Sequence, residues 1–356
     1  MTSGASGIYG MSLEMFKNKG LGADSVNRAL CVAPMMDWTD RHCRYFHRLL
    51  SPNALLFTEM VTAEAILHAG AERFCAHDRT EHPLVLQLGG SEPDRLAAAV
   101  RAVRDFRFEE INLNVGCPSP RVKAGCFGAS LMAEPELVAK CVAAMQAETD
   151  RPVTIKCRIG IDDMDEVVGL NNFVEAQIKA GVRIIYLHAR KAWLNGLSPK
   201  ENREIPPLNY GRAARLAADY SELDIILNGG LETAEDIRAA SEKGAFCGVM
   251  VGRAAYKTPR ELAAMSAKIF GHELADLQQI AEEMSCYAKT AAQKGVRLHS
   301  ITRHMLGLFT GLKGARYWRR TLGEQARRDT SQASLIAETA KICLAQQGAS
   351  SNRKVA

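Results

Sequence analysis

The sequence predicts a (β/α)8 barrel followed by a small all-helical domain. Short runs rich in Val, Ile and Leu recur through the first three quarters of the chain, and amphipathic stretches separate most of them. Continuous apolar runs of this length are typical of strands buried on both faces, as in parallel sheets. Eight strand–helix alternations within about 240 residues match a barrel in count and length, whereas doubly wound sheets rarely reach eight regular parallel units.

The expected strands and helices follow one another in a regular order. The strand-like runs span 30–36, 54–60, 83–90, 110–118, 152–160, 183–190, 224–230 and 247–254. Several of the stretches between them open with helix-start signals, such as an acid–proline pair at 92–93 and at 134–135, and Thr233 followed by acids. This alternation favours one large barrel over two smaller domains.

Residue patterns divide the chain into four segments. Residues 1–27 are expected to form a flexible extension, because they lack the apolar stretch of a signal peptide and any strong periodicity. The barrel is expected over 28–272. Strand-like runs then stop, and a long amphipathic stretch opens an expected helical domain over 273–340. A flexible tail is expected over 341–356.

Composition and charge exclude only a few classes of protein. The chain has 356 residues, a net charge of +5 and ten cysteines, which form no C-x-x-C pair. This spacing argues against a zinc site, and scattered cysteines are typical of a reducing compartment. No apolar run reaches the roughly 20 residues that span a bilayer. We therefore expect a cytoplasmic protein without a metal site or a membrane segment, and the sequence implies no obligate protein partner.

Function in a barrel is expected at the carboxyl ends of the strands, because the active sites of these folds lie there. Each expected strand ends on residues that could bind a ligand or do chemistry. In order they are Pro34, Met35 and Met36; Glu59; Gln87; Asn114 and Cys117; Lys156 and Arg158; His188; Asn228, Gly229 and Gly230; and Gly252 and Arg253. A lone His or Lys at a strand end is more often structural, but agreement at eight strand ends predicts an active-site face.

The ends of the last two strands favour a phosphorylated cofactor. Glycine-rich turns after these strands commonly form a phosphate site in barrels, and Arg253 adds a charged partner. Gln87 can pair with the edge of a pyrimidine-like ring, and Lys156 supplies positive charge where a reduced flavin ring gains negative charge. No G-x-G-x-x-G follows a strand, so a dinucleotide site of the Rossmann type is not supported and FMN fits better.

Cys117 lies between Gly116 and Pro118 directly after the fourth strand, so its thiol is presented at a fixed point. Two chemistries are open. A nucleophilic thiolate would need a base, for which His188 is a candidate. An unactivated thiol stays mostly protonated at pH 7 and can act as a general acid. The acid role fits reduction of a carbon–carbon double bond, with hydride from a flavin to one carbon and a proton from Cys117 to the other.

The expected helical domain contains a strongly basic stretch. From Lys294 to Arg320 there are seven lysines and arginines, no Asp or Glu, and interleaved aromatic residues such as Tyr317 and Trp318. Most charge runs are only solvated helix faces. The absence of acids over the whole stretch favours RNA binding, because phosphates attract such charge and unstacked bases stack on aromatic rings.

Several motifs together point to one known family. They read APMMDWTD, NLNVGCPS, RIGIDD, HARKAWLNGLSPKENREIPPLNY, NGG, VGRAAY and SITRHMLGLFTGLKGARYWRRTL, and they span about residues 28 to 335. In these motifs the chain resembles the bacterial tRNA-dihydrouridine synthases, and most of all their A subfamily. The resemblance implies bound FMN, NADPH as the reductant, and reduction of uridines in the D-loop of tRNA, at positions 20 and 20a for this subfamily.

The resemblance also implies roles for individual residues. Cys117 would be the proton donor, and Asn114 would lie near the target base. The implied FMN contacts are Pro34, Met35, Met36, Gln87, Lys156, His188, Asn228, Gly229, Gly230, Gly252 and Arg253. The residues implied to help hold tRNA are Asn202, Arg203, Tyr317 and Arg320. Cys126, in the segment after Cys117, matches no role in the family.

Three other functions share part of this pattern. A flavin barrel acting on a free pyrimidine, as dihydroorotate dehydrogenases do, would share the fold and FMN but would not need the basic stretch. A non-catalytic RNA-binding barrel would not need Cys117, Lys156 and His188 together. A flavin-free barrel of the aldolase type would use Lys156 as a Schiff-base nucleophile, and a yellow purified protein would exclude it.

Overall fold

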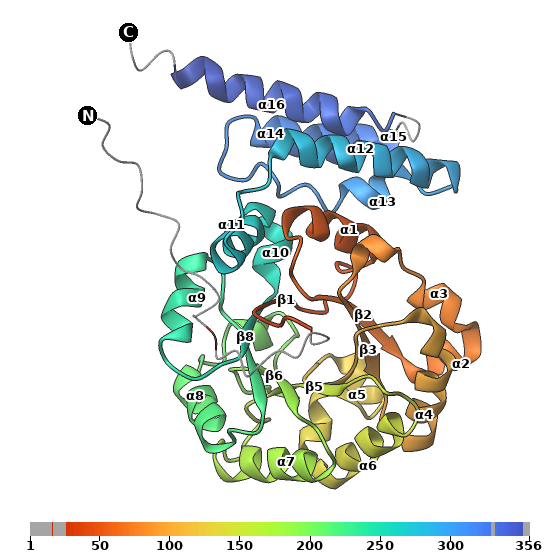
Figure 1. Ribbon diagram of the computed structural model, residues 1–356, viewed down its shortest axis with the longest axis vertical. Helices are drawn as coiled ribbons and strands as arrows, with labels where there is room; N and C mark the ends of the chain where they lie inside the picture. Colours follow the sequence, from red (N-terminus) through yellow and green to blue (C-terminus); the bar gives the residue numbers. More distant parts are fainter. Residues whose placement is uncertain (1–15, 17–25, 329–331, 352–356) are drawn as a thin grey trace.

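Parallel strands form a barrel surrounded by helices, which confirms the predicted fold class. The computed structural model describes residues 16, 26–328 and 332–351 (Figure 1). Within these residues the strands are β1 (Leu30–Val32), β2 (Leu56–Thr62), β3 (Leu84–Gly89), β4 (Glu110–Val115), β5 (Val153–Arg158), β6 (Ile184–His188), β7 (Asp224–Asn228) and β8 (Gly248–Val251). They pair in the order β1–β8–β7–β6–β5–β4–β3–β2. A parallel bridge between Cys31 and Leu55 joins β1 to the segment before β2 and closes the ring.

Helices follow the strands and cover the outside of the barrel (Figure 1). They are α1 (Arg41–Leu50), α2 (Ala63–Ala69), α3 (Ala71–Cys75), α4 (Pro93–Ala102), α5 (Pro120–Ala124), α6 (Pro135–Gln146), α7 (Val168–Lys179), α8 (Tyr210–Asp219), α9 (Ala234–Ser241), α10 (Arg253–Lys257) and α11 (Pro259–Phe270). The predicted start signals are present. Helices α4 and α6 begin with proline, where the first N–H groups lack partners in any case, and a capping box of Thr233 and Asp236 opens α9.

Alternate side chains of each strand point to the barrel interior and to the helices, so the core has two parts. On β3, Leu84, Leu86 and Leu88 belong to the outer cluster that packs with the helices, whereas Val85 belongs to an inner cluster. The other buried members of the inner cluster are Cys31, Ala33, Leu55, Phe57, Ile184, Tyr186, Ile226 and Met250. Burial on both faces explains why the strands read as continuous apolar runs in the sequence.

An ion pair closes the amino-terminal end of the barrel. The Glu110 carboxylate at the start of β4 is fully buried, and it accepts hydrogen bonds from Nε of Arg28 (2.5 Å) and from the Tyr186 hydroxyl (2.9 Å). Burial raises the pKa of Glu110, and the charge of Arg28 and these hydrogen bonds oppose that rise. A buried carboxylate needs such partners, because an unpaired one would carry the full cost of its desolvation.

The carboxyl-terminal part is a helical bundle beside the barrel. It contains α12 (Leu277–Gln293), α13 (Leu298–Thr302), α14 (Ala315–Arg320), the π-helical turn η6 (Thr321–Gln325), α15 (Ala326–Arg328) and α16 (Leu335–Ser351). Trp318 is buried in the bundle, where its Nε1 donates to the carbonyl oxygen of Met305 (2.8 Å) and its ring packs on Phe309. Figure 1 shows the bundle next to α1, α10 and α11, which places it at one edge of the barrel.

The predicted tail differs from the structure, and parts of the predicted extension and of the predicted tail lie outside the described residues. Helix α16 continues past residue 340, so the tail predicted for 341–356 begins inside a helix, and 352–356 lie outside the described residues. Of the predicted extension, 1–15 and 17–25 also lie outside the described residues, whereas Phe16 is buried against the core. Among the described helices, none combines the length and apolar character needed to cross a bilayer.

Gly248 starts β8 where that strand passes the backbone of β1. A Cβ atom there would lie 1.9 Å from the carbonyl oxygen of Arg28 and 3.1 Å from Cα of Ala29. We expect Gly248→Ala to lower the free energy of unfolding by about 3 kcal/mol or more, because the obstructing atoms are backbone and cannot rotate away. At Gly323 an added Cβ meets nothing within 4 Å, so Gly323→Ala should change stability by less than about 0.5 kcal/mol. Urea unfolding compares the two variants, and equal stability would contradict this account of the β1–β8 contact.

Candidate active site

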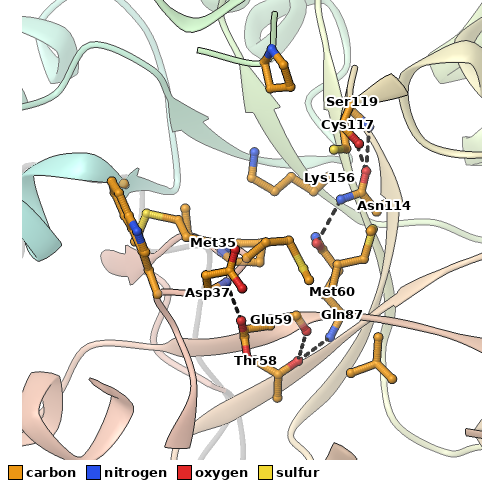
Figure 2. A pocket seen from close by; sticks show the side chains of 18 of the residues that line it. Met35, Asp37, Thr58, Glu59, Met60, Gln87, Asn114, Cys117, Ser119 and Lys156 are labelled. Atoms are coloured by element: carbon orange, nitrogen blue, oxygen red, sulfur yellow. Dashed lines mark hydrogen bonds between the residues drawn. The ribbon is translucent and has the colours of Figure 1, made fainter. Parts of the chain in front are cut away.

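A cavity of about 1300 Å³ lies at the carboxyl ends of the strands, where the sequence predicts the active-site face. It brings together residues from all eight predicted strand ends, of which the first lies in the loop after β1. The predicted site residues that line it are Pro34, Met35, Met36, Gln87, Asn114, Cys117, Lys156, His188, Arg203, Asn228, Gly229, Gly230, Gly252 and Arg253. Glu59, from the remaining strand end, lines it too. Figure 2 draws 18 of the lining residues, among them Asn114 on β4, Cys117 just after β4 and Lys156 on the neighbouring strand β5.

A chain of hydrogen-bonded amides crosses the floor of the cavity. The register of β3, β4 and β5 sets Gln87 beside Asn112 and Asn112 beside Thr154. Asn112 Nδ2 donates to Thr154 Oγ1 (2.9 Å), and Gln87 Nε2 donates to Asn112 Oδ1 (2.8 Å). Asn114 Nδ2 in turn donates to Gln87 Oε1 (2.9 Å), a bond drawn in Figure 2.

The two ends of this chain determine its direction. At the upper end, Asn114 Oδ1 accepts from the backbone N–H of Gly116 (3.1 Å) and of Cys117 (3.0 Å), and a backbone N–H can only donate. At the lower end, Thr154 hydrogen-bonds the buried carboxylate of Glu110. An ionised carboxylate only accepts, so each amide between the two ends has a single satisfied orientation. The backbone at Cys117 is thereby held by a network that reaches the Glu110–Arg28 ion pair.

Lys156 carries positive charge into the cavity beside this network. Its Nζ donates to Asn228 Oδ1 (2.9 Å), and Asn228 Nδ2 donates to the carbonyl oxygen of Met250 (2.7 Å). Burial, together with the positive charge of Arg158, lowers the pKa of Lys156 to about 8. The ammonium therefore remains the main form at pH 7, but it loses its proton more easily than an ordinary lysine.

His188 faces the same space as a neutral ring. Burial lowers its pKa well below the usual range, and the charges of Arg158 and Lys156 act in the same direction. Its ring packs on the turn after β7, where a Cβ atom at Gly229 would lie 2.4 Å from His188 Cδ2. A neutral imidazole has one donor and one acceptor nitrogen, so His188 suits hydrogen bonding to a ligand better than it suits charge pairing.

The glycine turns after β7 and β8 form a narrow edge of the cavity. Gly229 and Gly230 have φ values of 111° and 70°, in the left-handed region that glycine adopts without strain. Arg253 lies at the other turn, and its Nη1 donates to Glu204 Oε1 (2.5 Å) on the loop after β6. An anion at this edge could come close to the backbone of the glycine turns. It would also meet Arg253, whose present partner, Glu204, is partly exposed.

Arg158 lies under Cys117. All the hydrogen bonds that the structure shows for its side chain go to backbone carbonyl oxygens. Its Nε donates to the carbonyl oxygen of Gly116 (3.1 Å), and its Nη1 donates to those of Lys191 (2.9 Å) and Asn202 (2.8 Å). Burial lowers the pKa of Arg158 to about 10, which leaves it charged at pH 7. Sequence reasoning noted this strand end without giving it a role. The structure shows that it joins the Cys117 turn to the loop after β6.

Three of the residues predicted to hold tRNA lie away from the cavity. Asn202 is fully buried, and its side chain bonds the backbone N–H (2.8 Å) and carbonyl oxygen (2.9 Å) of Trp193. In this structure the amide braces the loop after β6, and its part in holding tRNA stays a prediction. Tyr317 and Arg320 lie on α14 in the helical bundle, where Arg320 is exposed and Tyr317 is half-buried.

The sequence analysis did not assign several residues that line the cavity. Trp38 and Asp40 come from the APMMDWTD motif, whose last four residues carried no predicted role. Met60, Arg121 and Phe127 line it from β2 and from the segment after Cys117. Met60 ends the second predicted strand, so the strand-end rule could have indicated it, whereas the motif around Asp40 was the signal for Trp38 and Asp40. No cluster of His, Cys, Asp and Glu among the described residues could hold a metal ion.

Fold and site together define an enzyme of the (β/α)8-barrel class, with a thiol and an electropositive cavity at the strand ends. The chain matches the family described as Dihydrouridine synthase (Dus) over residues 31–346, and it belongs to that family. This confirms the resemblance noted in its motifs.

Similar proteins come from several bacteria and share one name. A tRNA-dihydrouridine(20/20a) synthase of Vibrio parahaemolyticus is 51% identical over 317 residues, which is 88% of this chain and 96% of that protein. Proteins of the same name from Pseudomonas putida and Xanthomonas campestris are 49% identical over 314 residues (88% and 93% of the two chains) and 47% identical over 319 residues (90% and 94%). The alignments therefore include both the barrel and most of the helical bundle.

The lowered pKa of Lys156 has a consequence for stability. Between pH 8 and 10.5 the unfolded chain holds a proton on this lysine that the folded chain has lost, so stability should rise with pH in that window. The gain is at most about 3 kcal/mol, because each unit of difference in pKa between the two states is worth about 1.4 kcal/mol. Lys156→Met lacks the titrating group and serves as the reference, since it keeps all other titrations. Urea unfolding at pH 8 and pH 10 should show the rise in the difference between the two proteins, and a constant difference would contradict it.

Proposed function

We propose that this protein reduces the C5=C6 bond of uridines in the D-loop of tRNA to give 5,6-dihydrouridine, with FMN bound in the cavity and NADPH as the reductant. Relatives of 47 to 51% identity carry the name tRNA-dihydrouridine(20/20a) synthase, which supports positions 20 and 20a as the targets. The observation that carries the proposal is the half-buried thiol of Cys117, held by Asn114 at the edge of an electropositive cavity.

The residues around the cavity fit FMN in charge and shape. The turns at Gly229, Gly230 and Gly252 with Arg253 would hold the phosphate, because they line the cavity and offer backbone N–H groups and a guanidinium, the usual partners of a phosphate. Gln87, Lys156 and His188 would contact the ring system, together with Pro34, Met35 and Met36 from the loop after β1. When bound and reduced by NADPH, the flavin supplies a hydride to C6 of the uracil.

Cys117 would supply the other half of the reduction. Its thiol gives a proton to C5 and becomes a thiolate, so one hydride and one proton add across the double bond. The positive charges of Lys156 and Arg158 interact with Cys117, and they would stabilise the thiolate that this step leaves. Asn114 lies between Cys117 and the ring-binding Gln87, which suits a contact with the target base. The target uridine must leave its stack to reach this depth.

The helical bundle would grip the rest of the tRNA. The basic stretch 294–320 lies on this bundle, and its residues Lys294, Arg297, Arg316, Arg319 and Arg320 are exposed. Arg203 lies at the mouth of the cavity and would meet RNA close to the reacting base. We therefore treat 28–272 as the catalytic barrel and the helices that follow as the RNA-binding unit, in a protein that acts on tRNA in the cytoplasm.

Replacement of the proposed acid separates the two half-reactions. In Cys117→Ala, NADPH should still reduce the flavin at a near-normal rate, because other strands hold the cofactor. Reoxidation of the reduced flavin by tRNA should slow by about 10²–10⁴-fold, the usual contribution of a general acid. Stopped-flow absorbance of the flavin measures both steps. Cys126→Ala, an exposed thiol nearby in the sequence, should behave like the wild type. A Cys117→Ala protein that reoxidises at the normal rate would show that another group is the acid.

The RNA grip should depend strongly on salt, because its contacts are with phosphates. Arg320→Met should weaken binding of all tRNAs alike and reduce the slope of log Kd against log salt by about 1. Lys179→Met is a matched control, since Lys179 is exposed at the end of α7, at the opposite edge of the barrel from the bundle (Figure 1). Filter binding from low to moderate salt gives both slopes. Identical slopes for Arg320→Met and Lys179→Met would exclude Arg320 from the contact.

A further inference from the structure

The loop between β1 and α1 is a compact turn that carries three of the proposed FMN contacts. Within it, Thr39 Oγ1 accepts from the backbone N–H of Met35 (3.0 Å), and the N–H groups of Trp38 (3.1 Å) and Thr39 (2.9 Å) donate to the Met35 carbonyl oxygen. These bonds make Pro34, Met35 and Met36 one unit with the residues that follow. Whatever positions Trp38 and Asp40 therefore positions the wall of the cofactor site.

Asp40 fastens this loop to the helical bundle. Its Oδ1 caps α1 by accepting from the N–H groups of His42 and Cys43, both at 3.0 Å. Its Oδ2 points the other way, accepts from Arg303 Nη2 (2.7 Å) and lies 3.0 Å from His304 Nε2, just after α13. Burial of Asp40 opposes ionisation, but the hydrogen bonds and charge of His304 and Arg303 prevail and lower its pKa well below the usual range.

A second contact joins the same two bundle residues to the phosphate side of the site. The Trp38 ring stacks on Tyr256, with centroids 4.3 Å apart and planes 9° from parallel. Tyr256 lies on α10, which begins at Arg253, and its hydroxyl donates to the carbonyl oxygen of Arg303 (3.4 Å). The edge of its ring meets His304 at 5.7 Å. Arg303 and His304 thus touch both the loop after β1 and the helix after β8.

We propose that Arg303 and His304 couple the RNA-binding bundle to the cofactor site, with Asp40 as the positioning residue that transmits the coupling. The inference rests on the proposed function, because it names FMN and tRNA as the two ligands. Arg303 belongs to the basic stretch and is about one-third exposed, so RNA can reach it. A ligand that binds the bundle and orders this cluster also favours the ordered form of the cofactor loops. FMN must then strengthen the binding of that ligand to the same extent, since coupling free energies are reciprocal.

One substitution breaks this link while it keeps the fold of the loop. Asp40→Asn retains a good helix cap, because asparagine caps as well as aspartate does. It also sets an amide NH2 group against Arg303 Nη2, which can only donate. We expect FMN to leave the Asp40→Asn holoenzyme about tenfold faster than it leaves the wild type. The recovery of free FMN fluorescence after dilution measures this rate without any turnover.

Matched variants separate coupling from general damage. Arg303→Met removes one donor from the other side of the contact and should also release FMN several-fold faster, which tests the proposal even if Asp40→Asn fails to fold. Asp276→Asn changes the same kind of residue at the exposed cap of α12, away from the cavity, and should release FMN at the wild-type rate. Normal FMN release from both Asp40→Asn and Arg303→Met, even with a lowered thermal midpoint, would show a structural role only and overturn the coupling.

Added tRNA gives the reciprocal test. In the absence of NADPH, saturating tRNA should slow FMN release from the wild type several-fold, and this effect should be absent from Asp40→Asn. An equal effect of tRNA on both proteins would overturn the coupling but leave the proposed function intact. A wild-type protein that holds no FMN would overturn both, so the two failures can be told apart.

Discussion

The hydrogen-bonded chain from Glu110 to the backbone of Cys117 runs through the interior of the barrel, where the side chains that link the two ends are buried. Thr154, Asn112, Gln87 and Asn114 are its links. Each buried amide left unpaired would cost about 1–3 kcal/mol, so the links must be satisfied together or not at all. A carboxylate at one end and a backbone N–H at the other leave one direction for the whole chain. The position of the thiol and the orientation of Gln87 both follow from that constraint.

Charge around the cavity is organised by the same strands. Lys156 and Arg158 lie two residues apart on β5, so both side chains point inward beside the amide chain. Their hydrogen-bond partners are an amide oxygen and backbone carbonyl oxygens. Burial keeps His188 neutral, and the positive field of these two residues acts in the same direction and favours anionic groups in the cavity. The glycine turns after β7 and β8 border the cavity beside this field. The barrel interior thus combines a rigid hydrogen-bonded floor with the positive charges of Lys156 and Arg158 above it.

The helical bundle is more than an attachment to this barrel. Its contact with the loop after β1 uses an ion pair, a stacked aromatic pair and a buried histidine in one cluster, centred on Asp40, Trp38 and His304. Cluster and cavity share residues, since Trp38 and Asp40 line both. A surface suited to RNA phosphates and a pocket suited to a phosphorylated cofactor are therefore connected through a single turn of the chain.

The sequence by itself determined the barrel, because eight apolar runs with punctuating helix starts leave few other folds, and it located the active-site face, because barrels place function at strand ends. It also indicated Cys117, Lys156 and the glycine turns, which are local in the chain. It did not reveal that Asn202 is a buried brace, that α16 runs past residue 340, or that Asp40 meets Arg303 and His304. Those facts depend on partners distant in the chain, and only tertiary packing brings such partners within hydrogen-bonding distance.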